Sequence, residues 1–278
     1  MTLTRLGSLG FVLILQFACG DVTQTCDKNV VLMGYWPPTN NMLRQWSTQP
    51  EQNPGGWQGQ NWRGLGYNVY AFFPEFPPDD DPTNDTIGSP GSVGSPDFDL
   101  QVDYQATSSD FWRIVDAYQP RILITTSRGG AIGWEIEAFE GRAEMAASPE
   151  LDWRSDDYGE VHLPTQASIE PRSWQAIATH RGKNLLASKL PMQKISAAVT
   201  DLNLTTVAID EATSGNYLSG FLGLHGLYYN NTHAHNLAAG HIHVGGQVST
   251  EAARTMMEET LQTVLKALPS EQAACAAK

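Results

Sequence analysis

Basic residues are scarce in this chain of 278 residues: 17 lysines and arginines stand against 30 aspartates and glutamates, and the net charge is −13. A protein that binds nucleic acid needs a basic face, so we expect no nucleic-acid partner. Long apolar runs are also missing, since no stretch reaches the length of about 20 apolar residues that crosses a bilayer. With 41% hydrophobic residues, the chain is still long enough to bury a sizeable core.

Cysteine is rare as well, with only Cys19, Cys26 and Cys275 in the whole chain. None of the three lies inside a recognisable catalytic motif, which argues against a cysteine nucleophile. If Cys19 is modified with lipid, Cys26 and Cys275 remain as an even pair in an oxidising compartment. We therefore predict a possible disulfide between these two, which would tie the ends of the folded domain together.

The first 19 residues have the anatomy of an export signal. One cation, Arg5, precedes an apolar run over residues 6–17, and the small Ala18 stands directly before Cys19. The run is too short to span a bilayer, and the small residue before a cysteine resembles the lipobox of bacterial lipoproteins. We predict an exported protein, either a lipoprotein of the cell envelope lipidated on Cys19 or an ordinary secreted protein. Membrane contact is expected only through such an anchor.

Beyond a short linker over residues 20–28, we predict a single domain over residues 29–278. Apolar β-type runs alternate there with helical patterns. The strands are expected at 29–35, 67–76, 121–127, 205–212 and 239–245, and the helices at 108–120, 190–204, 214–229 and 249–268. Such alternation predicts an α/β fold, a three-layer sandwich whose mostly parallel, twisted central sheet has helices on both faces. Residues 77–99, rich in Pro, Gly, Ser and Asp, indicate a solvated loop.

Reactive side chains follow or lie within three of the predicted strands. Glu135 and Glu137 come after the third strand, Ser219 opens the helix after the fourth, and His241 and His243 lie in the fifth. Sites of α/β proteins form beyond the carboxyl ends of their strands, and the alternation of a strand puts both histidines on one face. A hydroxyl, an imidazole and a carboxylate are the components of a hydrolytic triad. A plain capping role for the serine is the alternative at a helix start.

The histidines of "HAHNLAAGHIH" allow a second interpretation. His233, His235, His241 and His243 form two H-x-H pairs that could bind zinc. However, the first pair lies in a predicted loop without fixed geometry, and no cysteine or helical H-E-x-x-H spacing accompanies it. Our main hypothesis includes no metal and no other cofactor, with a histidine-based metal site as the alternative.

Several motifs, taken in order, resemble pyroglutamyl peptidase I (pyrrolidone-carboxylate peptidase), a family of cysteine peptidases. The segment "GYWPP" with Asn53–Pro54 is similar to the family's first loop, and "GGAIGWEIEA" places Glu137 at its catalytic glutamate. "LPMQKI" resembles a family helix, "SGNYLSGFLGLHGLYY" puts Ser219 where the nucleophilic cysteine stands, and "AGHIHVG" puts His243 at the base. The resemblance extends from about residue 29 to residue 267.

The resemblance implies removal of an N-terminal pyroglutamyl group from peptides through an acyl-enzyme. Ser219 would attack, His243 would take and return the proton, and Glu137 would hold the imidazole. It also implies substrate contacts from the following residues: Tyr35, Pro38, Asn53, Ser127, Tyr217 and Leu218. The expected partner is a peptide with a blocked N-terminus. The alternative is an inactive relative that binds such a peptide or serves as a cell-surface interaction domain. The oligomeric state stays open.

Overall fold

The computed structural model describes residues 28–75, 99–141, 185–213 and 217–268. Cys19, Cys26 and Cys275 lie outside these residues, as does nearly all of the predicted loop at 77–99. Export, lipidation and the disulfide therefore stay predictions. Within the described part of the chain, no helix has the length and apolar character needed to cross a bilayer.

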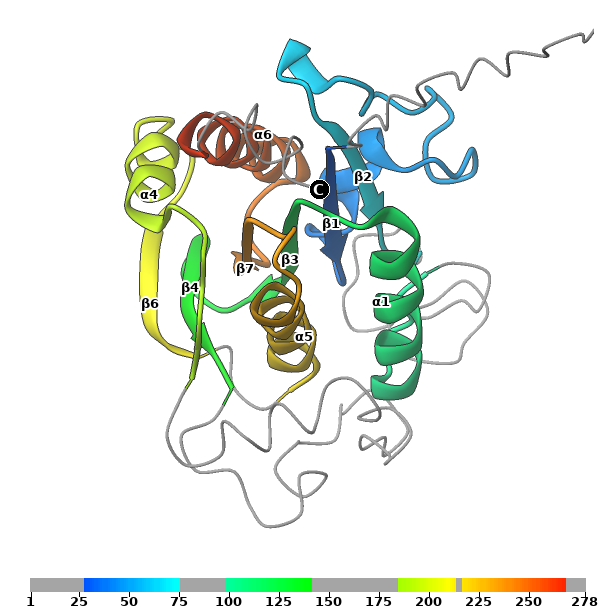
Figure 1. Ribbon diagram of the computed structural model, residues 1–278. Coiled ribbons are helices and arrows are strands. Elements are labelled where there is room, and N and C mark those ends of the chain that lie inside the picture. Colours follow the sequence, from blue (N-terminus) through cyan, green and yellow to red (C-terminus); the bar gives the residue numbers. More distant parts are fainter. Residues whose placement is uncertain (1–27, 76–98, 142–184, 214–216, 269–278) are drawn as a thin grey trace, which may run out of the picture.

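Seven strands form one mixed, mostly parallel sheet, in the order β2-β1-β3-β7-β4-β5 with β6 paired to β4. The strands are β1 (Asn29–Gly34), β2 (Asn68–Phe72), β3 (Ile122–Gly129), β4 (Trp134–Glu140), β5 (Leu186–Ala187), β6 (Val207–Thr213) and β7 (Ala238–Gly245). All neighbours are parallel except that β4 runs antiparallel to β7 and to β5. The sheet is strongly twisted, as Figure 1 shows.

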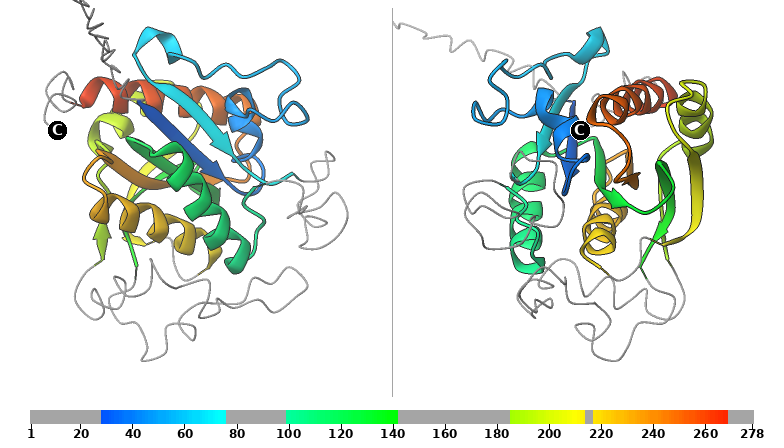
Figure 2. Two further views of the ribbon diagram at one scale, coloured as in Figure 1. Left: turned by 45° about the vertical axis from the view of Figure 1, so that its right-hand side comes forward. Right: turned by 180° about the vertical axis from the view of Figure 1, so that it is seen from behind.

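Helices cover both faces of the sheet, which confirms the predicted α/β fold. On one side lie α1 (Tyr104–Tyr118) and α5 (Leu218–Thr232), and on the other lie α4 (Met192–Thr200) and α6 (Thr250–Ala267) (Figures 1 and 2). Two short 3₁₀ helices, η1 (Asn41–Trp46) and η2 (Trp62–Gly64), follow β1. Each long helix packs on the sheet or on its neighbour: α5 contacts β3 and β7, α1 contacts α5, and α4 contacts α6.

Side-chain alternation in the central strands divides the core into two clusters. Val30 and Ile122 belong to the cluster under α4 and α6, whereas Val31 and Leu123 belong to the cluster under α1 and α5. All four side chains are fully buried. Central strands covered on both faces have to be apolar on both sides, and this explains the near-continuous apolar runs of β1 and β3.

Side-chain caps begin two of the long helices. The Asp103 carboxylate accepts hydrogen bonds from the backbone N–H groups of Gln105 and Ala106 at the start of α1, at 2.7 and 3.2 Å. The Ser249 hydroxyl accepts one from the N–H of Ala252 at the start of α6. Because a cap satisfies backbone donors that have no partner within the helix, it fixes where the helix begins. Helix α1 thus begins four residues before the predicted start.

Candidate active site

The glutamates of the site lie on β4, a strand that the sequence analysis did not predict. Trp134 and Ile136 are fully buried on the α4 and α6 side of the sheet, and Glu135 and Glu137 alternate with them. This apolar–polar alternation is the usual signal of a strand, but the glycine-rich segment directly before it is typical of a loop. A strand holds both carboxylates in fixed positions on the face that α5 covers.

Glu137 and His243 form a buried pair. The Glu137 Oε1 atom lies 2.7 Å from Nδ1 of His243, and the two residues are only 1% and 9% exposed. With a neutral imidazole, Nδ1–H donates to the carboxylate, so that Nε2 carries the free lone pair. Within the described residues, Nε2 of His243 makes no hydrogen bond. The arrangement matches the base and orienting acid of a hydrolytic triad.

His241 lies beside the pair in an internal hydrogen-bond network. Its Nδ1 is 2.8 Å from the Thr125 hydroxyl and its Nε2 is 2.9 Å from the Ser127 hydroxyl. Its ring contacts that of His243 edge-on, with the centroids 4.9 Å apart. Burial lowers the pKa of His241 well below its usual value, and His243 lowers it further. The neutral His241 is a packing and positioning group on β7, and Ser127 is its partner.

Ser219 occupies the first turn of α5 and is 9% exposed. One turn later, Gly223 lies against the end of β4, where a Cβ would come within 2.6 Å of Oε1 of Glu140. This close approach fixes the start of α5 over the strand that carries Glu137. Within the described residues, no hydrogen bond joins the Ser219 hydroxyl to His243. In enzymes without substrate, catalytic hydrogen bonds are often long and shorten when substrate binds.

A second carboxylate, Glu135, stands directly opposite His243 in the β4–β7 ladder. Burial raises its pKa, and the neighbouring negative charge of Glu137 raises it further. Glu135, Glu137 and His243 each offer a donor atom, and these atoms lie within 4.8 Å of one another. From the sequence, Glu135 is only a carboxylate that follows a predicted strand, without a role in the triad.

The structure places three of the predicted substrate contacts in structural roles. Tyr35 is fully buried, and its hydroxyl lies 2.6 Å from that of Thr107 on α1. The Asn53 amide donates to one backbone carbonyl in η1 and to two in the loop after it. Pro38 is buried in the turn before η1. Tyr35, Pro38 and Asn53 thus support the first loop in this structure, and substrate contact by these three residues stays a prediction.

The residues on either side of the α5 start differ in exposure. Tyr217, the N-cap residue, is 47% exposed, and it is one of only two exposed large apolar side chains among the described residues. Leu218 is 1% exposed and belongs to the core cluster under α1 and α5. Tyr217 is thus the predicted contact that is free to meet a ligand next to Ser219.

The four histidines of the alternative zinc site do not come together. His235 lies with its Nε2 2.7 Å from the Tyr229 hydroxyl, and His233 stacks on the ring of Tyr229. Both precede the start of β7, whereas His241 and His243 lie within that strand. The separation leaves no shared coordination sphere for the four imidazoles.

Gly129, the first of the paired glycines, makes room for the site. A Cβ at Gly129 would lie 2.7 Å from Cβ of His243, whereas a Cβ at Gly130 would meet no atom within 4 Å. We expect Gly129→Ala to lower the free energy of unfolding by about 1–3 kcal/mol, because β7 must shift. Gly130→Ala, the matched control, should change it by less than about 0.5 kcal/mol. Urea denaturation measures both, and equal losses would contradict the close approach.

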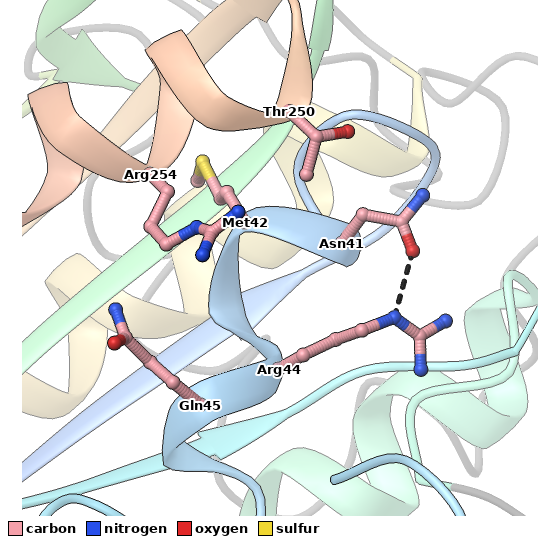
Figure 3. Close-up of a pocket in the computed structure, with 6 residues that line it drawn as sticks. All are labelled: Asn41, Met42, Arg44, Gln45, Thr250 and Arg254. Carbon is pink, nitrogen blue, oxygen red and sulfur yellow. Dashed lines mark hydrogen bonds between the residues drawn. The ribbon is translucent and has the colours of Figure 1, made fainter. Parts of the chain in front are cut away.

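A cavity of about 280 Å³ lies elsewhere, between η1 and the first turns of α6 (Figure 3). It is lined by Asn41, Met42, Arg44, Gln45, Thr250 and Arg254. Arg44 is held there by Asn41, 2.9 Å away, and by an ion pair with Glu75. Because η1 and α6 cover the face opposite to α5, this cavity is separated from Glu137 and His243 by the sheet.

The fold and site together define an α/β protein with a buried glutamate–histidine pair beneath a helix start. No protein-family model matches the chain, and no curated protein matches it. Among solved structures, a variant of the pyrrolidone carboxyl peptidase of Pyrococcus furiosus is 16% identical, with a TM-score of 0.56 over 87% of this chain and 100% of that one. The enzyme of Thermococcus litoralis is 15% identical, with a TM-score of 0.54 over 86% and 94%. The chain therefore has the fold of pyrrolidone carboxyl peptidases.

Proposed function

We propose that this protein is an exported peptidase-like hydrolase that removes an N-terminal pyroglutamyl or related group through a Ser219–His243–Glu137 acyl-enzyme mechanism. The 2.7 Å contact between Nδ1 of His243 and Oε1 of Glu137 is the observation that carries the proposal. A buried carboxylate on Nδ1 is what a general-base histidine requires, since it fixes the tautomer and stabilises the imidazolium. The likeness in fold to pyrrolidone carboxyl peptidases supports the reaction class.

In the proposed mechanism, Nε2 of His243 takes the proton of the Ser219 hydroxyl while its oxygen attacks the substrate carbonyl. The imidazolium then gives the proton to the leaving amine. In the second step, water attacks the acyl-enzyme while Nε2 of His243 takes its proton, and the imidazolium returns that proton to the Ser219 oxygen as the acyl group leaves. The unpaired N–H groups in the first turn of α5 lie next to Ser219, where negative charge develops on the oxyanion. A serine has to be deprotonated during attack, so the tautomer of His243 matters more here than it would for a thiolate.

Tyr217 is the proposed contact for the blocked N-terminus of the peptide. The residue is 47% exposed and adjoins the helix start that carries Ser219. A flat lactam ring has no charge, so an aromatic face suits it better than an ion pair. The predicted export signal would place this activity outside the cytoplasm.

Labelling with a fluorophosphonate probe tests the proposal directly, because the probe phosphonylates only an activated serine, with loss of fluoride. We expect stoichiometric labelling that maps to the peptide containing Ser219. Ser219→Ala should abolish it, whereas Ser127→Ala should not, since Ser127 is bonded to His241. Turnover of a fluorogenic pyroglutamyl amide then tests the substrate class. Absence of both labelling and turnover would exclude the hydrolase.

The second candidate is an inactive relative that binds peptides with a blocked N-terminus. It is favoured by one observation, that no hydrogen bond joins Ser219 to His243 within the described residues. Isothermal titration with a pyroglutamyl peptide separates the two candidates. An inactive binder gives saturable binding without labelling, and Tyr217→Ala weakens it.

A further inference from the structure

Glu135, Glu137 and His243 form a three-donor set on two adjacent strands. Their donor atoms lie within 4.8 Å of one another, and Glu135 and His243 are direct partners in the β4–β7 ladder. One imidazole nitrogen and two carboxylate oxygens are ligands that divalent transition metals such as Zn²⁺ accept. Strands of a packed sheet hold such ligands more rigidly than loops do.

A second observation at the same place is an unsatisfied oxygen. Glu137 is 1% exposed, and its Oε2 makes no hydrogen bond with any described residue. The other oxygen of the same carboxylate contacts His243, so Oε2 lies beside that contact. A buried carboxylate oxygen without a partner is costly, and a bound cation removes that cost.

The triad leaves Glu135 without a role, because Glu137 alone orients His243. A spare acidic group opposite the base adds negative charge to a site that already contains one buried carboxylate. Like charges held close together are unfavourable unless a cation or proton is shared between them. The position of Glu135 beside Glu137 and His243 therefore indicates that Glu135 is a ligand for a cation more than a structural group.

We propose that Glu135, Glu137 and His243 bind a divalent transition-metal ion of the zinc class, and that this ion competes with catalysis by Ser219. The binding of the metal is independent of the proposed function, whereas its competition with catalysis rests on that function. Ligand atoms around tetrahedral zinc lie about 3.4 Å apart, as follows from bond lengths of about 2.1 Å. Oε1 of Glu137 lies only 2.7 Å from Nδ1 of His243, so Glu137 would bind the ion through its unpartnered Oε2. The half-buried Glu135 side chain has the freedom to move to the ligand distance.

The competition follows from the tautomer of His243. In the Glu137–His243 pair, Nδ1 carries the ring proton and Nε2 carries the lone pair that accepts the proton of the Ser219 hydroxyl. When a metal takes Nδ1, the ring proton moves to Nε2, and no proton is gained or lost overall. The imidazole then has no lone pair left to accept the Ser219 proton, so acylation stops until the metal leaves.

The test is isothermal titration of zinc chloride into the full chain, after its cysteines have been alkylated so that thiolates do not bind the metal. We expect one equivalent of zinc in the wild type, with at least about 10-fold weaker binding in Glu135→Gln. Glu211→Gln removes an exposed carboxylate from the neighbouring β6 and is the charge-matched control, which should bind zinc like the wild type. Ser219→Ala should also bind like the wild type, because the hydroxyl is not a ligand.

The outcomes for binding and for catalysis are separable. Absence of the zinc equivalent, or equal affinity of the wild type and Glu135→Gln, would overturn the metal site whether or not Ser219 reacts. If zinc binds as expected, the rate of fluorophosphonate labelling should fall with zinc occupancy and recover with a chelator. Labelling unaffected by saturating zinc would overturn the competition. A zinc equivalent in a protein that is never labelled would support the metal site and count against the hydrolase.

Discussion

Glu137→Gln is expected to lower the rate constant for acylation of Ser219 by about 10³–10⁴-fold while the protein stays folded. The carboxylate accepts a hydrogen bond from Nδ1–H of His243 at 2.7 Å and so keeps the lone pair on Nε2. An amide in its place can donate to Nδ1 instead, which moves the ring proton to Nε2. The histidine then has the wrong tautomer to act as a base.

The measurement is the second-order rate constant of fluorophosphonate labelling, followed for the wild type and for two glutamine variants. Glu211→Gln, on the exposed side of β6, should label at the wild-type rate. The melting temperatures of all three proteins report on folding independently. If Glu137→Gln labels within a factor of about three of the wild type, the triad assignment fails, because removal of an orienting carboxylate costs far more in known triads.

Acidification is expected to destabilise the protein by about 3 kcal/mol between pH 6.5 and pH 4 through His225 alone. This histidine is fully buried in α5, against the rings of Phe221 and Phe111 at centroid distances of 4.3 and 5.3 Å. Its Nδ1 contacts the Phe221 carbonyl at 2.8 Å, and its Nε2 has no partner among the described residues. Burial lowers its pKa from 6.5 to about 4, partly offset by the bond to the carbonyl.

The sign follows from proton binding in the two states. The unfolded chain binds a proton at His225 near pH 6.5, whereas the folded protein binds it only near pH 4. Between these values acid stabilises the unfolded state alone, so the free energy of unfolding falls as the pH falls. Above pH 6.5 both forms are neutral, and below pH 4 both are charged, so the effect is confined to that window.

Urea denaturation of the wild type and of His225→Gln at pH 7.5, 5.5 and 4.0 isolates this effect. Glutamine keeps a hydrogen-bond donor but does not titrate, so the wild type should lose about 3 kcal/mol more than the variant over this range. Carboxylates and the other histidines contribute equally to both proteins and cancel in the difference. Parallel pH profiles would show that His225 is not the acid-sensitive group.

Much of the fold could be predicted from local patterns. The continuous apolar runs of β1 and β3 and the helical spacing of α1 and α6 follow from burial on one or two faces, which is a property of the sequence itself. Strand β4 was not predicted, although its alternation is clear in retrospect. Its antiparallel direction could not have been predicted, since strand direction depends on which partner the strand meets in the sheet.

The candidate site was predictable in part. The types and order of Ser219, Glu137 and His243 indicated a hydrolytic set, and the structure brings Glu137 and His243 into contact. The substrate contacts transferred by resemblance stay predictions: the polar atoms of Tyr35 and Asn53 are bonded to α1 and to η1 with the loop after it. A sequence motif does not say which neighbour occupies the polar atoms of its side chains.

The sequence alone determined the α/β class, because periodicity and chain order are enough to separate strands from helices. It also determined which side chains have the chemistry for the site. Only the tertiary structure decided how they are paired: that Glu137 holds His243, that His241 bonds to Thr125 and Ser127, and that Glu135 stands opposite the base. The reason is physical, since β7 is distant along the chain from both β3 and β4 and meets them only through the register of the sheet.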